Sequence, residues 1–130
     1  MAKLKLVILL MLAGIHNVNA HVSCTNIPVT SVNTVNNPGF HNFSELGVVG
    51  TILFLSIDKS LCTNSTGDPL STSLFMVIDN YDAGSPQKSL WASMLMTANV
   101  SGKKMDFHSS DLGVNTRGFQ VLRPYYIKMH

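Results

Sequence analysis

Histidine is the residue type in this chain best suited to hold a metal, and one histidine has a special position. If the chain is cut after Ala20, His21 becomes the first residue, and its amine and ring nitrogen can together chelate copper. Neutral imidazoles suit copper well, and His108 is a candidate for a further ligand. With His41 and His130, three histidines follow His21, which is about as many as composition alone would give. The residues therefore favour a protein without a cofactor. An exported copper-binding protein that uses His21 is the alternative.

Nucleophilic catalysis has little support in the sequence. No GxSxG motif is present, and no serine stands in a recognisable Ser/His/Asp arrangement. The two cysteines, Cys24 and Cys62, are far apart and form no CxxC motif, so a structural disulfide is favoured over a metal or redox pair. A disulfide leaves no free thiolate to act as a nucleophile. We therefore expect a protein that is not an enzyme.

The first twenty residues have the three parts of an export signal. Lys3 and Lys5 give a positive start, residues 6–15 are an almost unbroken apolar run, and residues 18–20 suit cleavage. The apolar run is shorter than the roughly 20 residues that cross a bilayer. The sequence therefore predicts a signal peptide at 1–20, no membrane anchor, and a secreted or periplasmic location.

Loss of the signal changes the charge of the protein. The full chain has nine Lys and Arg against seven Asp and Glu, and two of the lysines leave with the signal, so seven of each remain. No basic stripe is left to bind phosphates, which argues against a nucleic-acid partner. A low net charge causes little repulsion between copies and therefore permits a homo-oligomer.

The elements that must position any site belong to one domain, because about 110 residues build one core. Residues 21–44 are rich in Asn, Ser, Thr and Val with a Pro-Gly turn, which predicts an extended arm carrying a disulfide cysteine and at most a short edge strand. The compact domain is expected over residues 45–130. If these residues were divided into two domains, neither would have a sufficient core.

Alternating and β-branched segments predict four strands in that domain. Residues 47–58 (GVVGTILFLSID) form the first, and apolar side chains of both parities at 52–55 indicate burial on both faces. Residues 73–79 form the second strand. Residues 103–109 and 118–127 are expected to be closing strands.

A helix is predicted between the second and third of these strands. Ser85 is a suitable N-cap, Pro86 suits the first helical position, and Gly102 supplies the stop. Met96 falls outside the apolar stripe, which hints at packing against another subunit. The stripe itself is expected to bury Trp91 against the sheet, and its members are Leu90, Trp91, Met94, Leu95 and Ala98.

The order of these elements indicates an α+β fold. One helix among about five short strands is typical of a small β-barrel or a curved antiparallel sheet with the helix packed on it. The segment KSLWASMLMTANVSGKKMDFHSSD resembles small exported bacterial proteins similar to the B subunits of pentameric toxins of the subtilase-cytotoxin and typhoid-toxin type. This resemblance implies an OB-like barrel over residues 45–130, assembly as a pentameric ring, and glycan binding.

The resemblance also implies a binding residue. In those subunits a serine shortly after an aromatic residue, ahead of the first long strand, binds the carboxylate of sialic acid. Phe43-Ser44 precedes GVVGTILFLSID here, with a spacing that differs by about one residue, so Ser44 is implied as a ligand-binding residue. The family carries its cysteines in or beside the barrel strands, whereas Cys24 lies in the arm.

A shallow glycan site also needs aromatic faces and polar groups on a rigid scaffold. Tyr81, Asp82, Tyr125 and Tyr126 are candidates for these roles, although exposed tyrosines also pack at sheet edges with the phenol in water. The predicted function is a secreted binding protein that recognises a glycan or a protein. A structural or interaction domain without a small ligand is the remaining alternative.

Overall fold

The structure is a computed structural model that describes residues 21–130, so the predicted signal at 1–20 lies outside the described residues. Within this range the chain forms an α+β domain with seven strands and one α-helix. The strands are β1 (His21–Pro28), β2 (Asn33–Val35), β3 (Ile52–Ile57), β4 (Cys62–Asn64), β5 (Ser73–Asp79), β6 (Lys104–Val114) and β7 (Phe119–Met129). The helices are α2 (Pro86–Ser101) and two 3-10 segments, η1 (Phe40–Leu46) and η2 (Lys59–Leu61).

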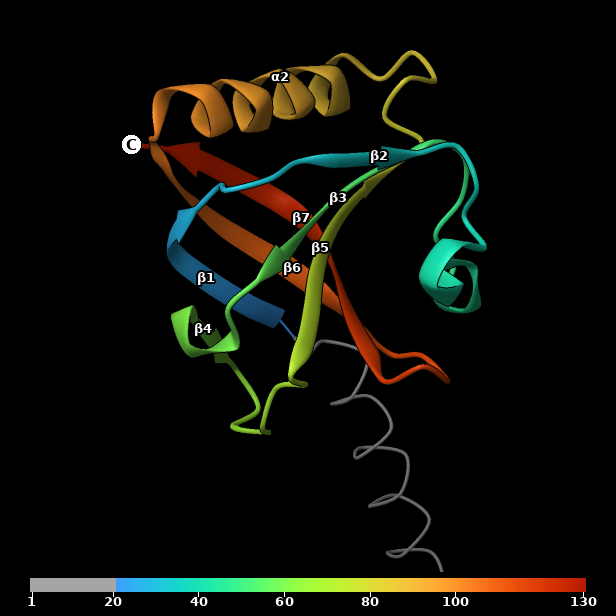
Figure 1. Cartoon of the computed structure of the whole chain (residues 1–130). Coiled ribbons are helices and arrows are strands. Elements are labelled where there is room, and N and C mark those ends of the chain that lie inside the picture. The colour runs from blue at the N-terminus through green and yellow to red at the C-terminus, as the bar shows by residue number, and fades with distance from the viewer. Residues whose placement is uncertain (1–20) are drawn as a thin grey trace, which may run out of the picture.

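All seven strands belong to one mixed sheet, in the order β2-β3-β5-β7-β6-β1-β4. Strands β5 and β7 are parallel, and the other neighbours are antiparallel. Although β1 and β2 lie toward opposite ends of this order, only residues 29–32 join them. The sheet therefore curves strongly, as Figure 1 shows beneath α2.

The expectation of an α+β fold with one helix on a curved sheet is confirmed, but three details are corrected. The sheet has seven strands rather than about five, and it is mixed rather than antiparallel. It is not a closed barrel, because no ladder joins β2 to β4 within residues 21–130. Strands of three residues, such as β2 and β4, carry too few side chains to show a periodic pattern.

The segment expected to be an extended arm contributes a strand to the interior of the sheet. Strand β1 pairs with β6 on one side and with β4 on the other. Its pattern is interrupted at Asn26, which has a positive φ of 55° where the register shifts. The Asn26 N–H donates to Asp106 Oδ1 at 2.9 Å, so the bulge is satisfied locally. Because of this irregularity and the terminal Pro28, the residue pattern of the segment does not indicate a strand.

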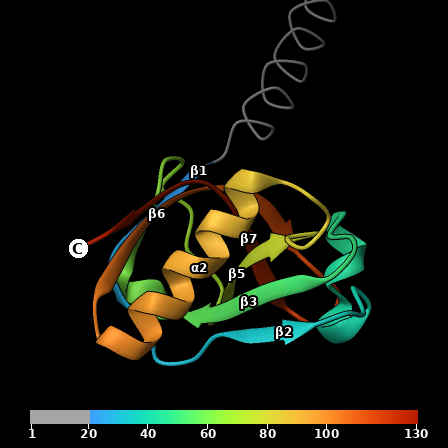
Figure 2. The same cartoon turned by 90° about the horizontal axis from the view of Figure 1, so that it is seen from above.

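The sheet is covered on both faces, which explains the apolar run in β3. Leu53 and Leu55 join the core beneath α2, which lies across the strands in Figure 2. Ile52 and Phe54 point to the opposite face and pack with Phe43 of η1. Both sets are buried, so the prediction of burial on both faces is confirmed. The strand is shorter than expected, because residues 47–51 bend toward it without strand pairing and Asp58 caps η2.

Helix α2 begins and ends where the capping residues indicate. The Ser85 side chain accepts a hydrogen bond from the Lys88 N–H, and Gly102 ends the helix with a φ of 72°. The prediction of which helix residues are buried is partly wrong. Leu95 and Ala98 are buried, but Leu90 is 59% exposed and Ala92 takes its place in the core.

The predicted disulfide between Cys24 and Cys62 is present. It joins β1 to β4 at paired positions of the ladder. Cys24 is fully buried in the core beneath α2. The bridge therefore fixes the N-terminal strand to the edge of the sheet.

Candidate functional site

The outer side of strands β1, β6 and β7 carries a group of polar and aromatic side chains. These strands are neighbours, and their alternate residues, such as Val22, Cys24 and Phe107, point inward to the core. The residues between them face solvent. We name this surface the histidine–tyrosine face and define it as His21, Ser23, His108, Tyr125 and Tyr126.

Strand pairing places these side chains together. Ser23 lies opposite His108, and its Oγ is 2.9 Å from His108 Nδ1. The His108 ring packs near Tyr126, with 5.0 Å between the centroids. Tyr125 is stacked on His108 at 6.4 Å and meets His21 edge-on at 5.6 Å. Five residues from three strands thus form one continuous surface.

A bulge in the ladder exposes two consecutive tyrosines on this face. Ser109 pairs with Pro124 and His108 with Tyr126, which leaves Tyr125 as the extra residue. Tyr125 is 51% exposed and Tyr126 45% exposed, although neighbours in a regular strand point to opposite faces. Proline cannot donate to a ladder and commonly marks such a bulge. The bulge thereby adds Tyr125 beside Tyr126 on the histidine–tyrosine face.

The predicted site residues are divided among three places. Tyr125 lies on the histidine–tyrosine face, together with His21 and His108, the two alternative copper ligands. Ser44 is exposed on η1, where its N–H donates to the Pro38 carbonyl at 2.7 Å.

The loop residues form the third place. Tyr81 lines a shallow hollow with Thr34, Val35, Asn36 and Thr51, and Asp82 is exposed beside it. No hydrogen bond or ring contact within residues 21–130 joins Ser44, Tyr81 or Asp82 to Tyr125. Ser23 was missed by sequence reasoning, although it shares its parity with His21 in the pattern HVSC, which is the signal that could have found it.

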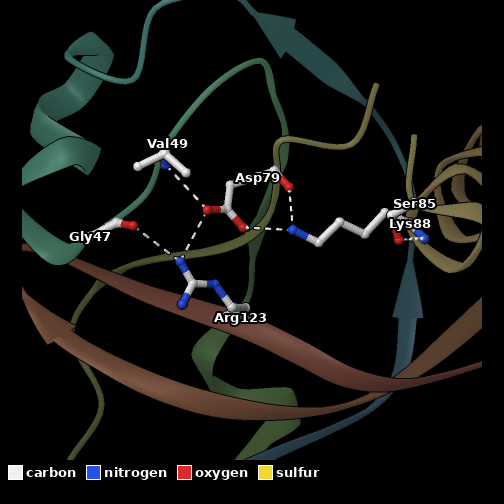
Figure 3. Close-up of polar contacts among 6 residues, drawn as sticks. All are labelled: Gly47, Val49, Asp79, Ser85, Lys88 and Arg123. Carbon is white, nitrogen blue, oxygen red and sulfur yellow. Dashed lines mark hydrogen bonds and ion pairs between the residues drawn. The ribbon is translucent and has the colours of Figure 1, made fainter. Parts of the chain in front are cut away.

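A second polar cluster surrounds the buried carboxylate of Asp79 at the end of β5 (Figure 3). Its Oδ2 is 3.0 Å from Arg123 on β7 and accepts the Val49 N–H at 3.2 Å. Its Oδ1 is 3.4 Å from Lys88 Nζ, which also donates to the Asp79 carbonyl at 2.7 Å. Arg123 donates further to the Gly47 carbonyl at 3.3 Å. We name this the Asp79 network.

Opposing effects act on the pKa of the Asp79 carboxyl. Burial raises this pKa, but the Val49 N–H and the Arg123 and Lys88 cations outweigh it and hold the pKa below its ordinary value. The carboxylate is therefore charged and fully bonded. The Asp79 network connects β5, β7, the start of α2 and the turn before β3, and its groups are occupied with one another. The network can stabilise the fold, and its carboxylate is buried and bonded on both oxygens.

An aromatic cluster around η1 packs the face of the sheet opposite α2. The His41 ring is stacked at 5.8 Å on Phe75 and meets Phe119 edge-on at 5.0 Å. Burial, with a smaller effect from Arg117, lowers the pKa of His41. Asn115 Nδ2 donates to the His41 carbonyl at 2.8 Å and holds a backbone with a positive φ of 51°. These contacts pack η1 against the apolar core on the face of the sheet opposite α2.

A depression of about 350 Å³ lies beside the turn between β4 and β5. Its polar groups are largely bonded to one another: Gln120 accepts the Ser71 N–H at 2.7 Å and donates to Asp111 at 2.9 Å. Among residues 21–130, no cluster of three or more metal-binding side chains occurs and no helix is long and apolar enough to span a membrane. The histidine–tyrosine face is the better candidate, since its rings are exposed and its imidazoles are available.

Comparison with known proteins adds no relative to this description. No family model matches the chain, and neither the curated proteins nor the solved structures contain a match. The resemblance to toxin B subunits therefore stays a prediction.

Proposed function

We propose that this chain is an exported binding protein, related in fold to toxin B subunits, that uses the histidine–tyrosine face to bind a glycan. The observation that carries the proposal is the pair of half-exposed tyrosines beside His108 and Ser23 on three paired strands. Aromatic rings can stack on sugar faces, and imidazole and hydroxyl groups can bond to sugar hydroxyls. The ladder holds these groups in place before a ligand arrives. Binding rather than catalysis is the proposed activity.

The strand order supports an OB-like interpretation of the fold. In the sheet the five longer strands lie in the order β3-β5-β7-β6-β1. Along the chain, α2 lies between β5 and β6, the third and fourth of these strands. The short β2 continues β1 after residues 29–32 and pairs with β3, so the two sides of the curved sheet approach each other. OB-folds are five-stranded, partly open barrels of this general shape.

A secreted or periplasmic location is part of the proposal. The disulfide between Cys24 and Cys62 supports it, because such bonds persist in oxidising compartments.

Helix α2 offers a surface for assembly with further copies of the chain. Leu90, Met96 and Val100 are 59%, 45% and 87% exposed, and residues 89–101 contain no charged side chain. An uncharged surface can approach a second copy without repulsion. We expect native mass spectrometry of the exported protein to show an oligomer, a pentamer by the resemblance. We expect Val100→Glu to dissociate it, and a wild-type monomer would remove this part of the proposal.

A glycan array tests the binding activity directly. We expect the exported protein to bind a subset of glycans, and Tyr126→Ala to abolish this binding while the fold is retained. Tyr81→Phe, in the separate hollow, is the matched control and is expected to bind normally. Loss of binding in Ser44→Ala but not in Tyr126→Ala would move the site to η1. No binding at high protein concentration would leave an interaction domain without a small ligand.

A further inference from the structure

His21 and His108 are neighbours across the ladder between β1 and β6. His21 pairs with Ser110 and Ser23 with His108, so the two histidines occupy diagonal positions on one face. Diagonal residues of an antiparallel pair have Cα atoms roughly 7–8 Å apart, which long side chains can bridge. Both rings also contact Tyr125, which places them on the same side of the sheet. Residues 87 positions apart in the chain are thereby brought within reach of a common ligand.

The surroundings of His108 suit a metal ligand. Its Nδ1 is 2.9 Å from Ser23 Oγ, and its Nε2 has no hydrogen-bond partner within residues 21–130. With the proton on Nδ1, that nitrogen donates to Ser23, and Nε2 presents its lone pair to solvent. Metal-binding histidines commonly donate their second ring nitrogen in this way, which fixes the tautomer and the orientation of the ring.

We propose that the exported chain binds one Cu²⁺ ion through the His21 amine, the His21 ring and Nε2 of His108. The His21 nitrogen donates to Ser65 Oγ at 3.3 Å at the exposed start of β1, and a cut after Ala20 turns it into an amine. Amine and ring nitrogen of one histidine close a chelate, in which Cu²⁺ takes the place of that hydrogen bond. His108 supplies the third nitrogen from the adjacent strand. Nitrogen ligands of this type favour Cu²⁺ over the other divalent ions of the first transition series. The site shares residues with the proposed glycan surface but does not depend on glycan binding.

Titration of the exported, metal-free protein with Cu²⁺ alone tests the proposal. Calorimetry should give one ion per chain, and electron paramagnetic resonance should show nitrogen coupling. We expect His108→Gln to weaken binding by at least about tenfold. His21→Gln should weaken it at least as much, because it removes the ring nitrogen that closes the chelate with the amine. His130→Gln keeps the fold and both ligands, and is the matched control.

The outcomes separate the two proposals. Equal Cu²⁺ affinity in the wild type, the His108→Gln variant and the His21→Gln variant would overturn the copper site. An exported chain that does not begin at His21, shown by its mass, would overturn it as well. The Cu²⁺ titration uses no glycan and the glycan array uses metal-free protein, so each measurement tests one proposal. Failure of the metal titration therefore leaves the glycan proposal untouched, and a negative glycan array leaves the copper site untouched.

Discussion

The Asp79 network and the histidine–tyrosine face are both polar clusters on the same sheet, but they differ in how their groups are used. The Asp79 carboxylate is 3% exposed and has partners on both oxygens. On the histidine–tyrosine face, Tyr125 and Tyr126 are about half exposed, and the Nε2 of His108 has no partner in the described part of the chain. A satisfied buried cluster stabilises the fold, whereas an exposed and unsatisfied one is available to a ligand.

The disulfide supports one of these regions and should give the largest effect on stability. Replacing Cys24 and Cys62 together with alanine removes the bond that ties β1, with His21 and Ser23, to β4. We expect a loss of about 4 kcal/mol, because the bridge closes a loop of 38 residues in the unfolded chain. Urea denaturation monitored by Trp91 fluorescence measures this loss. An unchanged midpoint would show that the ladder alone holds β1.

Removal of the Asp79 carboxylate should have the next largest effect. Asp79→Ala leaves Arg123 and the Val49 N–H without their partner, and we expect a loss of about 3 kcal/mol. Asp82→Ala, in the exposed loop nearby, is the control and should change stability by less than about 0.5 kcal/mol. Equal losses in the two variants, measured by urea denaturation, would contradict the structural role of the Asp79 network.

Acid should weaken the Asp79 network progressively. The pKa of Asp79 in the folded chain is lowered from its ordinary 3.8, so its contribution is present above that value and is lost as the pH falls through the lower folded pKa. Stability should therefore decrease from about pH 5 downward. Asp79→Asn is expected to show a shallower decrease over the same range. Parallel curves for the two proteins would assign the acid sensitivity to other carboxyl groups, such as Asp58 and Asp106, whose pKa values are also lowered.

The smallest effect on stability is expected on the histidine–tyrosine face. Tyr126→Ala removes a half-exposed ring and should change the free energy of unfolding by less than about 0.5 kcal/mol, while abolishing glycan binding. The comparison is sharpest when Asp79→Ala shows the opposite result. That variant should have lower stability but normal glycan binding at urea concentrations below its unfolding midpoint. A large loss of stability in Tyr126→Ala would make this ring a structural residue.

Local features of the chain were sufficient to predict several parts of the structure. Ser85, Pro86 and Gly102 mark the ends of α2, because caps act within a few residues of the positions that need them. The apolar run of β3 indicated a strand covered on both sides, and the two cysteines indicated their own pairing. Each of these predictions rests on short-range geometry or on there being a single possible partner.

The tertiary structure alone decided the position of β1, the Asp79 network and the make-up of the histidine–tyrosine face. Ser23 and His108 are 85 positions apart, and Asp79 and Arg123 are 44 apart. Their contacts depend on which strands are neighbours and on ladder register, including the bulge that exposes Tyr125. Strand preference depends on the neighbours that a strand obtains rather than on its own residues. Such pairings are therefore settled only when the whole sheet assembles.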